Sequence, residues 1–390
     1  MRVGIIGYGK MGRNIFTLFS ETPMDVTVLG RDPAEMDRQS GRLEKRLRRA
    51  VSTGMLEERD LPRRLAALRF TTSWDALREC DLVIETVKED FDTKIAVLRR
   101  AEETVAPQAV LTSNTSSLSI TRLAEHLRDP ARFCGFHFFH PIQLTSIVEI
   151  LTAQRTSPDV VELLRRISRD IGRTPLVMKD LAGSCINVPL AWHTCEMLYI
   201  LEQGLASPSR IDAIAGRFAR LGPCETLDTV GIPFFTDVLQ RTIDGFGFDL
   251  AVPELCRTLI RDGRFGKYAN GGVYLYRDDR PTDDAREYYL SPAQTHTPSG
   301  ARSDDVGLYE RLLFPIYFSM LTVAQRGLGD LGDLCLGISD VIGLKLDPLE
   351  EMRKLGSAGL REVFDRLRDA LGPRYDGRPL AGIMASVDNR

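Results

Sequence analysis

Residues 135–150, GFHFFHPIQLTSIVEI, hold two histidines three residues apart, His137 and His140, and a glutamate, Glu149, twelve residues after the first histidine. Imidazole moves protons near neutral pH, and a carboxylate is the usual group that fixes its tautomer. These residue types therefore indicate general acid–base chemistry. Three phenylalanines flank His137, however, so a core histidine with a satisfied ring explains this stretch equally well by itself.

A glycine-rich turn near the amino end could hold phosphates. The segment RVGIIGYGKMG is a short apolar run followed by Gly7, Gly9 and Gly12, and the next residues have the apolar spacing of a helix. Between a strand and a helix, such glycines give a tight turn, a close approach of backbone to pyrophosphate, and close helix packing. Backbone amides at the helix start would face the phosphates. The turn, with Met11 beside it, therefore predicts a site for NAD or NADP rather than an ordinary glycine-rich loop.

The end of the second predicted strand, DVTVLG, bears on which of the two cofactors binds. NAD sites normally place an acidic residue there to bind the adenosine ribose, and this place falls on Gly30, followed by Arg31. Glycine leaves room for a 2′-phosphate, and a guanidinium can bind it. These two residues favour NADP. The alternative is that Asp32 reaches the ribose, if the strand ends one residue later, in which case NAD is favoured.

The elements that must position these residues alternate between strand and helix. Strand patterns such as DLVIE and AVLTS are separated by helical patterns such as DTKIAVLRRAEETV, which predicts a parallel sheet with helices on both faces. We therefore expect an α/β domain of the Rossmann type over residues 1–178. Its ligand crevice should lie at the carboxyl ends of the strands, where the following polar residues fall: Glu85, Glu89, Asn114, Ser116 and His137.

Composition excludes several classes of protein. The net charge is -3 and the pI about 6.1, so nothing attracts nucleic acid or an anionic membrane overall. No signal peptide and no run of 18 apolar residues is present, which predicts a cytoplasmic protein. Seven cysteines are scattered singly, without the spacing of metal ligands, and are expected to be reduced core residues. No metal site is predicted.

Eight ordered segments together resemble the L-3-hydroxyacyl-CoA dehydrogenase family, over roughly residues 1–280. They are GIIGYGKMG, LVIETVKEDFDTK, SNTSSLSI, GFHFFHP, SIVEI, DLAGSCINVPL, GPCETLDTVG and FGKYANGGVYLY. The resemblance implies an oxidoreductase of fatty acid metabolism that interconverts a 3-hydroxyacyl and a 3-oxoacyl thioester, carried by coenzyme A or a carrier protein. It also implies NAD as the usual cofactor of the family.

The resemblance implies roles for several residues. His137 matches the general acid/base, and Glu149 matches the glutamate that orients it. Ser116 matches the serine that binds the reacting oxygen, and Asn187 the asparagine that helps to place the substrate. On the cofactor side, the resemblance implies contacts from three further residues, of which the first two could instead be plain surface charges: Glu89, Lys94 and Asn114.

The sequence departs from the family at two site positions. His140 stands where an asparagine is usual, which either keeps a polar contact to the substrate or reshapes the pocket. Val188 stands where an arginine is common. A helix with basic residues, within GRLEKRLRRAVSTGML, resembles the one near the acyl carrier, although a solvated basic face is the favoured interpretation. Its basic residues are Lys45, Arg46, Arg48 and Arg49.

The carboxyl half is predicted to be helical, with a helical domain over 179–280, a linker over 281–305 and a second helical domain over 306–390. The second helical domain repeats the first: LEQGLASPSRID, GPCETLDTVG and VLQRTIDGFG are echoed by AQRGLGDLGDLC, DPLEEMRKLG and VFDRLRDALG, 123 to 125 residues later. His193 is expected to be an ordinary helix residue. A second copy could take the place of a partner's domain, giving a monomer with an internal pseudo-dimer, or else a homodimer through another surface.

Two other functions use the same scaffold. A dehydrogenase of a free hydroxy acid or sugar acid would need a cation for the carboxylate instead of a thioester tunnel. A binding protein without catalysis would keep the nucleotide fold, but His137, Glu149, Ser116 and Asn187 count against it.

Overall fold

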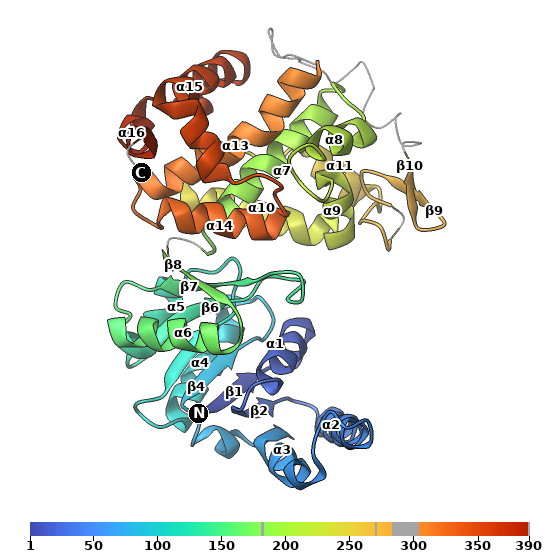
Figure 1. Ribbon diagram of the computed structural model, residues 1–390, viewed down its shortest axis with the longest axis vertical. Helices are drawn as coiled ribbons and strands as arrows, with labels where there is room; N and C mark the ends of the chain where they lie inside the picture. The colour runs from blue at the N-terminus through green and yellow to red at the C-terminus, as the bar shows by residue number, and fades with distance from the viewer. Residues whose placement is uncertain (181–182, 270, 283–303, 389–390) are drawn as a thin grey trace. The chain divides into compact units, whose positions relative to one another are not determined.

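The computed structural model describes residues 1–180, 183–269, 271–282 and 304–388 (Figure 1). The chain divides into two compact units, Met1–Gly183 and Ser184–Arg390. Strands and helices alternate in the first unit, whereas the described part of the second is almost entirely helical. This confirms the predicted order of a Rossmann-type fold followed by helical structure. Among the described residues, no helix is long and apolar enough to cross a membrane.

The first unit is built on an eight-stranded sheet in the order β3-β2-β1-β4-β5-β6-β7-β8. Every neighbouring pair of strands is parallel except β6 and β7, which are antiparallel. The strand order turns at β1 and β4, where open sheets of this kind bind ligands. The strands are β1 Arg2–Ile6, β2 Asp25–Leu29, β3 Leu68–Thr71, β4 Leu82–Glu85, β5 Val110–Ser113, β6 Phe133–His137, β7 Ile147–Thr152 and β8 Thr174–Lys179. The helices are α1 Lys10–Ser20, α2 Pro33–Ser52, α3 Leu61–Ala67, α4 Phe91–Thr104, α5 Ile120–Ala124 and α6 Pro158–Asp170.

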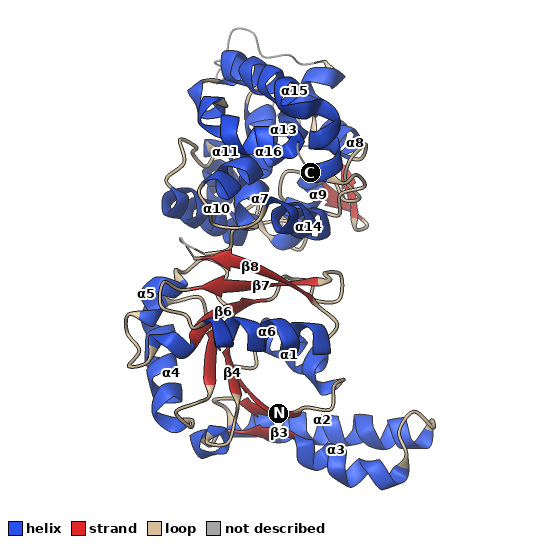
Figure 2. Ribbon diagram, turned by 60° about the vertical axis from the view of Figure 1, so that its left-hand side comes forward, coloured by secondary structure: helices blue, strands red, loops and turns tan. Residues whose placement is uncertain are grey.

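Alternating side chains of the strands divide between the two faces of this sheet. Helices α1 and α6 pack on one face over a core that includes Val26, Val28 and Phe136. Helices α4 and α5 cover the opposite face (Figures 1 and 2). Helices α2 and α3 lie side by side and extend away from the sheet (Figure 2). The helices pack on the two faces of the sheet, and loops follow the carboxyl ends of the strands.

The second unit differs from the all-helical prediction by one hairpin. Strands β9 and β10 pair around Asp278 and Asp279, both with positive φ, which is the backbone of a two-residue hairpin turn. The predicted linker lies mostly outside the described residues, as does His296. The elements are α7 Asn187–Glu202, α8 Pro208–Ala215, α9 Pro223–Val230, α10 Ile232–Phe246, α11 Glu254–Arg261, β9 Leu275–Arg277, β10 Arg280–Thr282, α13 Asp305–Gln325, α14 Leu331–Ile342, α15 Pro348–Leu371 and α16 Ala381–Asp388.

The two segments predicted to be repeats share their helix boundaries. Helices α7 and α13 both end before a glycine with left-handed φ, 64° at Gly204 and 66° at Gly327. Helices α9 and α15 both begin at a proline, Pro223 and Pro348, which are 125 residues apart. At Gly356, 125 residues after the glycine that separates α9 from α10, α15 has non-helical dihedrals. The first copy's two helices therefore correspond to the two halves of α15.

Equivalent residues of the two copies also contact one another. Ala219 and Leu344, again 125 residues apart, form an antiparallel bridge. On either side of it, Arg220 N donates to Gly343 O at 2.9 Å and Lys345 N donates to Phe218 O at 2.8 Å. Exchanging each residue for its equivalent turns one of these hydrogen bonds into the other. Such reciprocal contacts are those of a twofold axis in a symmetric dimer.

All seven cysteines are buried and free, which confirms their expected place as core residues. Their burial raises the pKa of several of the thiols, for example of Cys80 to about 11. A raised pKa keeps these thiols neutral, which makes them poor nucleophiles.

Candidate functional site

The predicted pair of His137 and Glu149 is assembled by two strands. The two residues face one another in the antiparallel pairing of β6 and β7, and His137 Nδ1 lies 3.0 Å from Glu149 Oε2. The His137 side chain is 5% exposed and that of Glu149 is fully buried. Directly opposed residues of an antiparallel pair project to the same face with adjacent Cβ atoms. The local β-pairing alone therefore brings the imidazole and the carboxylate together.

Strand alternation separates His137 from the phenylalanines beside it. Phe136 and Phe138 belong to the core beneath α1 and α6, so His137, between them, projects to the other face. Phe139 lies against the imidazole, with ring centroids 4.4 Å apart. The aromatic residues thus form the core and one wall of the site.

The glycine turn has the geometry that a pyrophosphate requires. Gly7 has φ 102°, a conformation that favours glycine, and a Cβ at Gly12 would lie 2.2 Å from Gly7 O. A Cβ at Gly9 would meet nothing within 4 Å, and Gly9 gives α1 no side-chain cap. The first amides of α1 therefore receive no side-chain cap from Gly9. Met11, in the first turn, packs partly on the core. This turn fits a dinucleotide.

The structure explains Gly30 in part by packing. Strand β2 ends at Leu29, and a Cβ at Gly30 would lie 2.5 Å from Cε and Sδ of Met36. Any side chain at this position must therefore displace Met36. Asp32 caps helix α2, because its carboxylate accepts a hydrogen bond from Ala34 N at 3.0 Å. Arg31 is exposed, and we find no hydrogen bond or ion pair to it within the described chain.

Lys94 and Glu89 are not plain surface charges. Lys94 is 1% exposed, and its ammonium group lies 2.9 Å from Glu85 Oε1 and 3.3 Å from Glu89 Oε2. Glu89 is 30% exposed and also accepts hydrogen bonds from the turn over residues 115–117, including one of 3.0 Å from Ser116 N. Burial would raise the pKa of Glu89, but Lys94 and the hydroxyls of the turn outweigh it and lower the pKa. Glu85, at the end of an apolar strand, is the buried partner of Lys94, and the sequence analysis assigned it no individual role.

Asn114 supports the histidine strand. Its Oδ1 accepts a hydrogen bond of 2.9 Å from Phe138 N, and its own amide donates to Glu85 O at 2.9 Å. It thereby links the ends of β4 and β5 to the residue after His137. The family resemblance implied only a cofactor contact for it. The linking role could not be read from the sequence, because it depends on which strands are neighbours.

The remaining predicted residues are divided between the units. His140 follows β6 closely, and partial burial together with the charge of Lys10 lowers its pKa. Asn187 opens helix α7 in the second unit and is buried, with its backbone amide 3.3 Å from Ser184 Oγ. Val188 follows it, also buried. Ser116 lies in the turn held by Glu89.

The basic residues of α2 lie on an exposed face, in agreement with the favoured interpretation. Lys45, Arg46, Arg48 and Arg49 are all exposed, and Arg48 pairs with Glu44 of the same helix at 2.6 Å. Surface pairs of this kind contribute little to stability. The helix therefore offers charge to solvent, and no contact in the structure assigns it a ligand.

Two family-like motifs of the second unit are joined by a residue that the sequence pattern did not single out. Asp228, from GPCETLDTVG, is buried and accepts hydrogen bonds from Val273 N, Tyr274 N and Tyr276 Oη of FGKYANGGVYLY, at 2.8, 2.9 and 3.1 Å. Burial nevertheless raises its pKa to about 6. A Cβ at Gly272 would lie 1.9 Å from Asp228 Oδ1, so the glycine permits this contact. The two motifs are structural partners.

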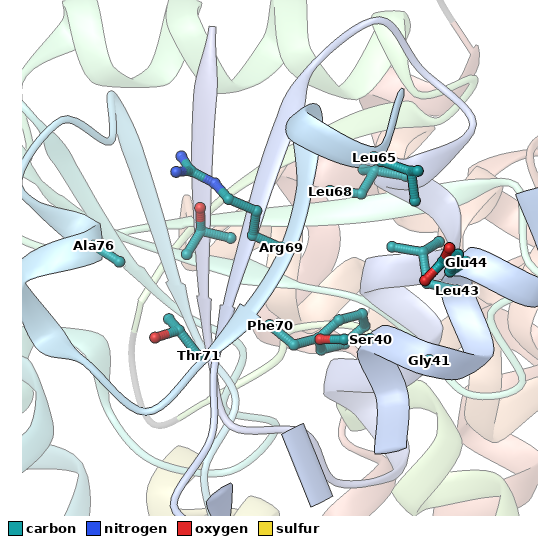
Figure 3. Close-up of a pocket in the computed structure, with 11 residues that line it drawn as sticks. Ser40, Gly41, Leu43, Glu44, Leu65, Leu68, Arg69, Phe70, Thr71 and Ala76 are labelled. Atoms are coloured by element: carbon teal, nitrogen blue, oxygen red, sulfur yellow. The ribbon is translucent and has the colours of Figure 1, made fainter. Parts of the chain in front are cut away.

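A cavity of about 560 Å³ lies elsewhere in the first unit, around the edge strand β3 and helix α2 (Figure 3). Its wall includes Ser40, Glu44, Arg69 and Phe70, and none of the predicted site residues lines it. Across the described ranges, no group of three or more His, Cys, Asp or Glu side chains could hold a metal ion.

Comparison with known families gives two consecutive matches. Residues 2–181 match the model described as 3-hydroxyacyl-CoA dehydrogenase, NAD binding domain, and residues 187–276 match the one described as 3-hydroxyacyl-CoA dehydrogenase, C-terminal domain. The boundary between the matches falls where the structure changes from the first unit to the second. The second helical copy lies beyond both matches.

Relatives cover the chain to different extents. A probable 3-hydroxybutyryl-CoA dehydrogenase of Deinococcus radiodurans is 31% identical over 280 residues, which are 71% of this chain and 100% of that protein. The fatty acid oxidation complex subunit alpha of Vibrio campbellii is 26% identical over 98% of this chain, which spans 54% of that longer protein. The crystal structure of 3-hydroxybutyryl-CoA dehydrogenase from Escherichia coli covers 100% of this chain and 99% of its own, with a TM-score of 0.85 at 22% identity. The fold therefore extends over both helical copies.

Proposed function

The chain belongs to the 3-hydroxyacyl-CoA dehydrogenase family, and from that premise we propose that it interconverts a 3-hydroxyacyl-CoA and a 3-oxoacyl-CoA with His137 as the general acid/base. The observation that carries this proposal is the 3.0 Å contact of His137 Nδ1 with the buried carboxylate of Glu149. With Nδ1 donating to Glu149, Nε2 carries the lone pair and can accept a proton. The carboxylate also stabilises the imidazolium that forms.

The residues then divide the work as follows. In the oxidation direction, Nε2 of His137 takes the proton from the substrate hydroxyl, and in the reduction direction it returns that proton to the oxygen. Ser116 binds the same oxygen, and its turn is fixed by Glu89. We assign Asn187 the substrate contact that the family resemblance implies, and Glu89 accepts from the nicotinamide ribose. When bound, the nicotinamide cofactor accepts or supplies the hydride.

The test is a panel of 3-oxoacyl-CoA thioesters, carrier-protein thioesters and free 3-oxo acids, assayed with NADH and NADPH. We expect turnover of a coenzyme A thioester, and a loss of about a hundred- to ten-thousand-fold in His137→Ala with cofactor binding retained. Near-normal turnover in His137→Ala would transfer the role to His140 or refute the mechanism. Turnover of free acids alone would favour a hydroxy acid dehydrogenase on the same scaffold.

For the cofactor, we propose a preference for NADPH over the NAD that is usual in the family. Gly30 leaves no carboxylate to repel a 2′-phosphate, Asp32 is engaged as the cap of α2, and Arg31 is exposed at the end of β2. A guanidinium can bind a phosphate through two parallel hydrogen bonds. The packing of Met36 against Gly30 is the competing reason for the glycine.

Dissociation constants decide between these reasons. We expect Arg31→Ala to weaken NADPH by about tenfold or more and NADH little, since a charge-assisted hydrogen bond contributes about 1.5–3 kcal/mol. Lys45→Ala, which removes another exposed charge, is the control and should leave the ratio unchanged. Tighter binding of NADH by the parent, with a ratio unaffected by Arg31→Ala, would contradict the preference and leave Asp32 as the ribose ligand.

A further inference from the structure

A buried ion pair lies directly beneath the turn that carries Ser116. Glu85, at the end of β4, has a fully buried side chain, and that of Lys94 in α4 is 1% exposed. The ammonium group lies 2.9 and 3.1 Å from the two oxygens of Glu85, which also accept hydrogen bonds of 2.6 Å from Ser113 Oγ and from Val87 N. Both carboxylate oxygens of Glu85 are therefore held by donors from three consecutive elements.

The same ammonium group reaches the carboxylate of Glu89, which is 30% exposed, at 3.3 Å. The two oxygens of Glu89 have different surroundings. Oε1 accepts from Thr115 Oγ1, from Ser116 N, and from both N and Oγ of Ser117. Oε2 contacts the ammonium group of Lys94. Exposure thus increases from Glu85 through Lys94 to Glu89, and the outermost carboxylate keeps an oxygen that can accept further hydrogen bonds.

We propose that Glu85 is a positioning residue for the cofactor: it compensates the charge of Lys94 and so leaves Glu89, fixed on the Ser116 turn, available to the ribose hydroxyls. This inference rests on the proposed function, in which Glu89 accepts from the nicotinamide ribose. The ammonium group of Lys94 lies between the carboxylates of Glu85 and Glu89 and contacts both. If Glu85 were neutral, Lys94 would pair with Glu89 alone, and Glu89 would be drawn toward the interior as its counter-ion.

Stability alone is a weak reason for such an arrangement. Two buried charges lose their hydration, and a pair of this kind is often no more stabilising than apolar residues of similar volume. Removing one partner, by contrast, leaves an uncompensated charge in the interior and is strongly destabilising. A mutation of Glu85 therefore has to be tested by a measurement that separates positioning from loss of fold.

A double-mutant cycle on cofactor binding makes that separation. Dissociation constants of the reduced cofactor are measured by fluorescence titration for the parent, Glu85→Gln, Glu89→Gln and the double variant. We expect each single variant to weaken binding by about tenfold, the value of one charge-assisted hydrogen bond, and the double variant to be no weaker than Glu89→Gln. Additive effects, or parent-like binding by Glu85→Gln, would refute the proposal.

Two further variants separate an effect on cofactor binding from a loss of stability. Glu85→Leu/Lys94→Met removes both buried charges together, so no ammonium group remains to draw Glu89 inward, and we expect this variant to fold and to bind the cofactor within about twofold of the parent. Binding as weak as that of Glu85→Gln in this variant would contradict the proposal that Glu85 acts by compensating Lys94. Glu196→Gln breaks an equally buried pair in the second unit, with Arg311 at 2.9 Å, and should lower the melting temperature without changing the dissociation constant. Turnover of 3-oxoacyl-CoA by the parent tests the proposed function separately, because the cycle measures binding alone.

Discussion

The two helical copies of the second unit share a backbone plan and differ in their side chains. Chain reversals fall at the same places: Gly204 and Gly327 end α7 and α13, and Pro223 and Pro348 begin the next matched helices. Chemistry does not follow the repeat. Asn187 at the start of α7 corresponds to Glu310, which pairs with Arg366 at 2.9 Å. The comparison teaches that positions that set the path of the chain are retained in both copies, whereas the position proposed to contact the substrate is not.

The second copy supplies the residues that pack against α7 of the first copy. Helices α7 and α13 pack together, with His193 Nδ1 2.7 Å from Leu312 O. Glu196 is fully buried and accepts from Arg311, Arg374 and Tyr375. These partners come only from the second copy. The second copy thus completes the core of the first, as a partner's domain would in a dimer.

The largest effect should come from removing the second copy. Deleting residues 306–390 removes the packing of α13 on α7, so apolar surface around Trp192 becomes exposed and the chain should dimerise or aggregate. The full chain should be a monomer, or a dimer through another surface. Light scattering after size-exclusion chromatography measures both. A soluble, monomeric truncated chain would show that the second copy does not cover the first.

Breaking the buried cluster between the copies should have the next largest effect. Glu196→Gln leaves Arg311, 4% exposed, without its carboxylate, and we expect a loss of about 3–5 kcal/mol in the free energy of unfolding. Urea titration measures it. Glu254→Gln, which removes the partner of an exposed Arg257, is the matched control and should cost less than about 1 kcal/mol. Equal losses would mean that the cluster does not join the copies.

The equivalent residues Asn187, at the start of α7, and Glu310, within α13, should differ in their effect on activity. Asn187→Ala removes a proposed substrate contact, and kcat/KM should fall by about a hundredfold, or about 2.7 kcal/mol. Glu310→Ala changes the corresponding residue of the second copy, and its kcat/KM should stay within about twofold of the parent. Steady-state kinetics with a 3-oxoacyl-CoA compare the two. If both variants lose activity to the same extent, the second copy is more than a structural partner.

The smallest effect concerns pH. Burial lowers the pKa of His193 to about 4, so the unfolded chain binds its proton more tightly than the folded one. The stability from this group is full above about pH 6.5 and is lost as the pH falls toward 4. Between pH 7.5 and 5.5 the loss should be about 1.4 kcal/mol, and His193→Gln should lack that part of the decrease. Urea titrations at the two pH values measure it; identical decreases would place the acid sensitivity elsewhere.

Local patterns were sufficient to predict much of the site. The glycine turn, the alternation of strands and helices and the spacing of His137 and Glu149 are short-range features, and they predicted the strand pair that joins those two residues. The cysteines and the helical character of the second unit were also predicted. Roles assigned to Ser116, Asn187 and the cofactor residues remain predictions, to be decided by the experiments above.

Features that depend on tertiary neighbours were not predictable. Asn114 meets Phe138 because β5 and β6 are adjacent in the sheet, and Glu85 meets Lys94 because α4 packs back on β4. Asp228 joins two motifs about 45 residues apart through backbone amides, which carry no sequence signature. The surface-charge alternative for Lys94 was wrong for the same reason. A lysine in a helical pattern gives no sign that two carboxylates lie behind it.

The polar cluster around Glu196 lies on only one side of the local twofold axis. The residue equivalent to Arg311 is Val188, and the residue equivalent to Glu196 is Ser319, so this ion pair has no counterpart across the twofold axis. In a dimer of identical chains every substitution occurs twice, and a change that helps one side must be tolerated by the other. Fusion of the copies into one chain removes that constraint. Each half can accumulate its own mutations, so one side of the interface is free to evolve for recognition while the other evolves for cohesion.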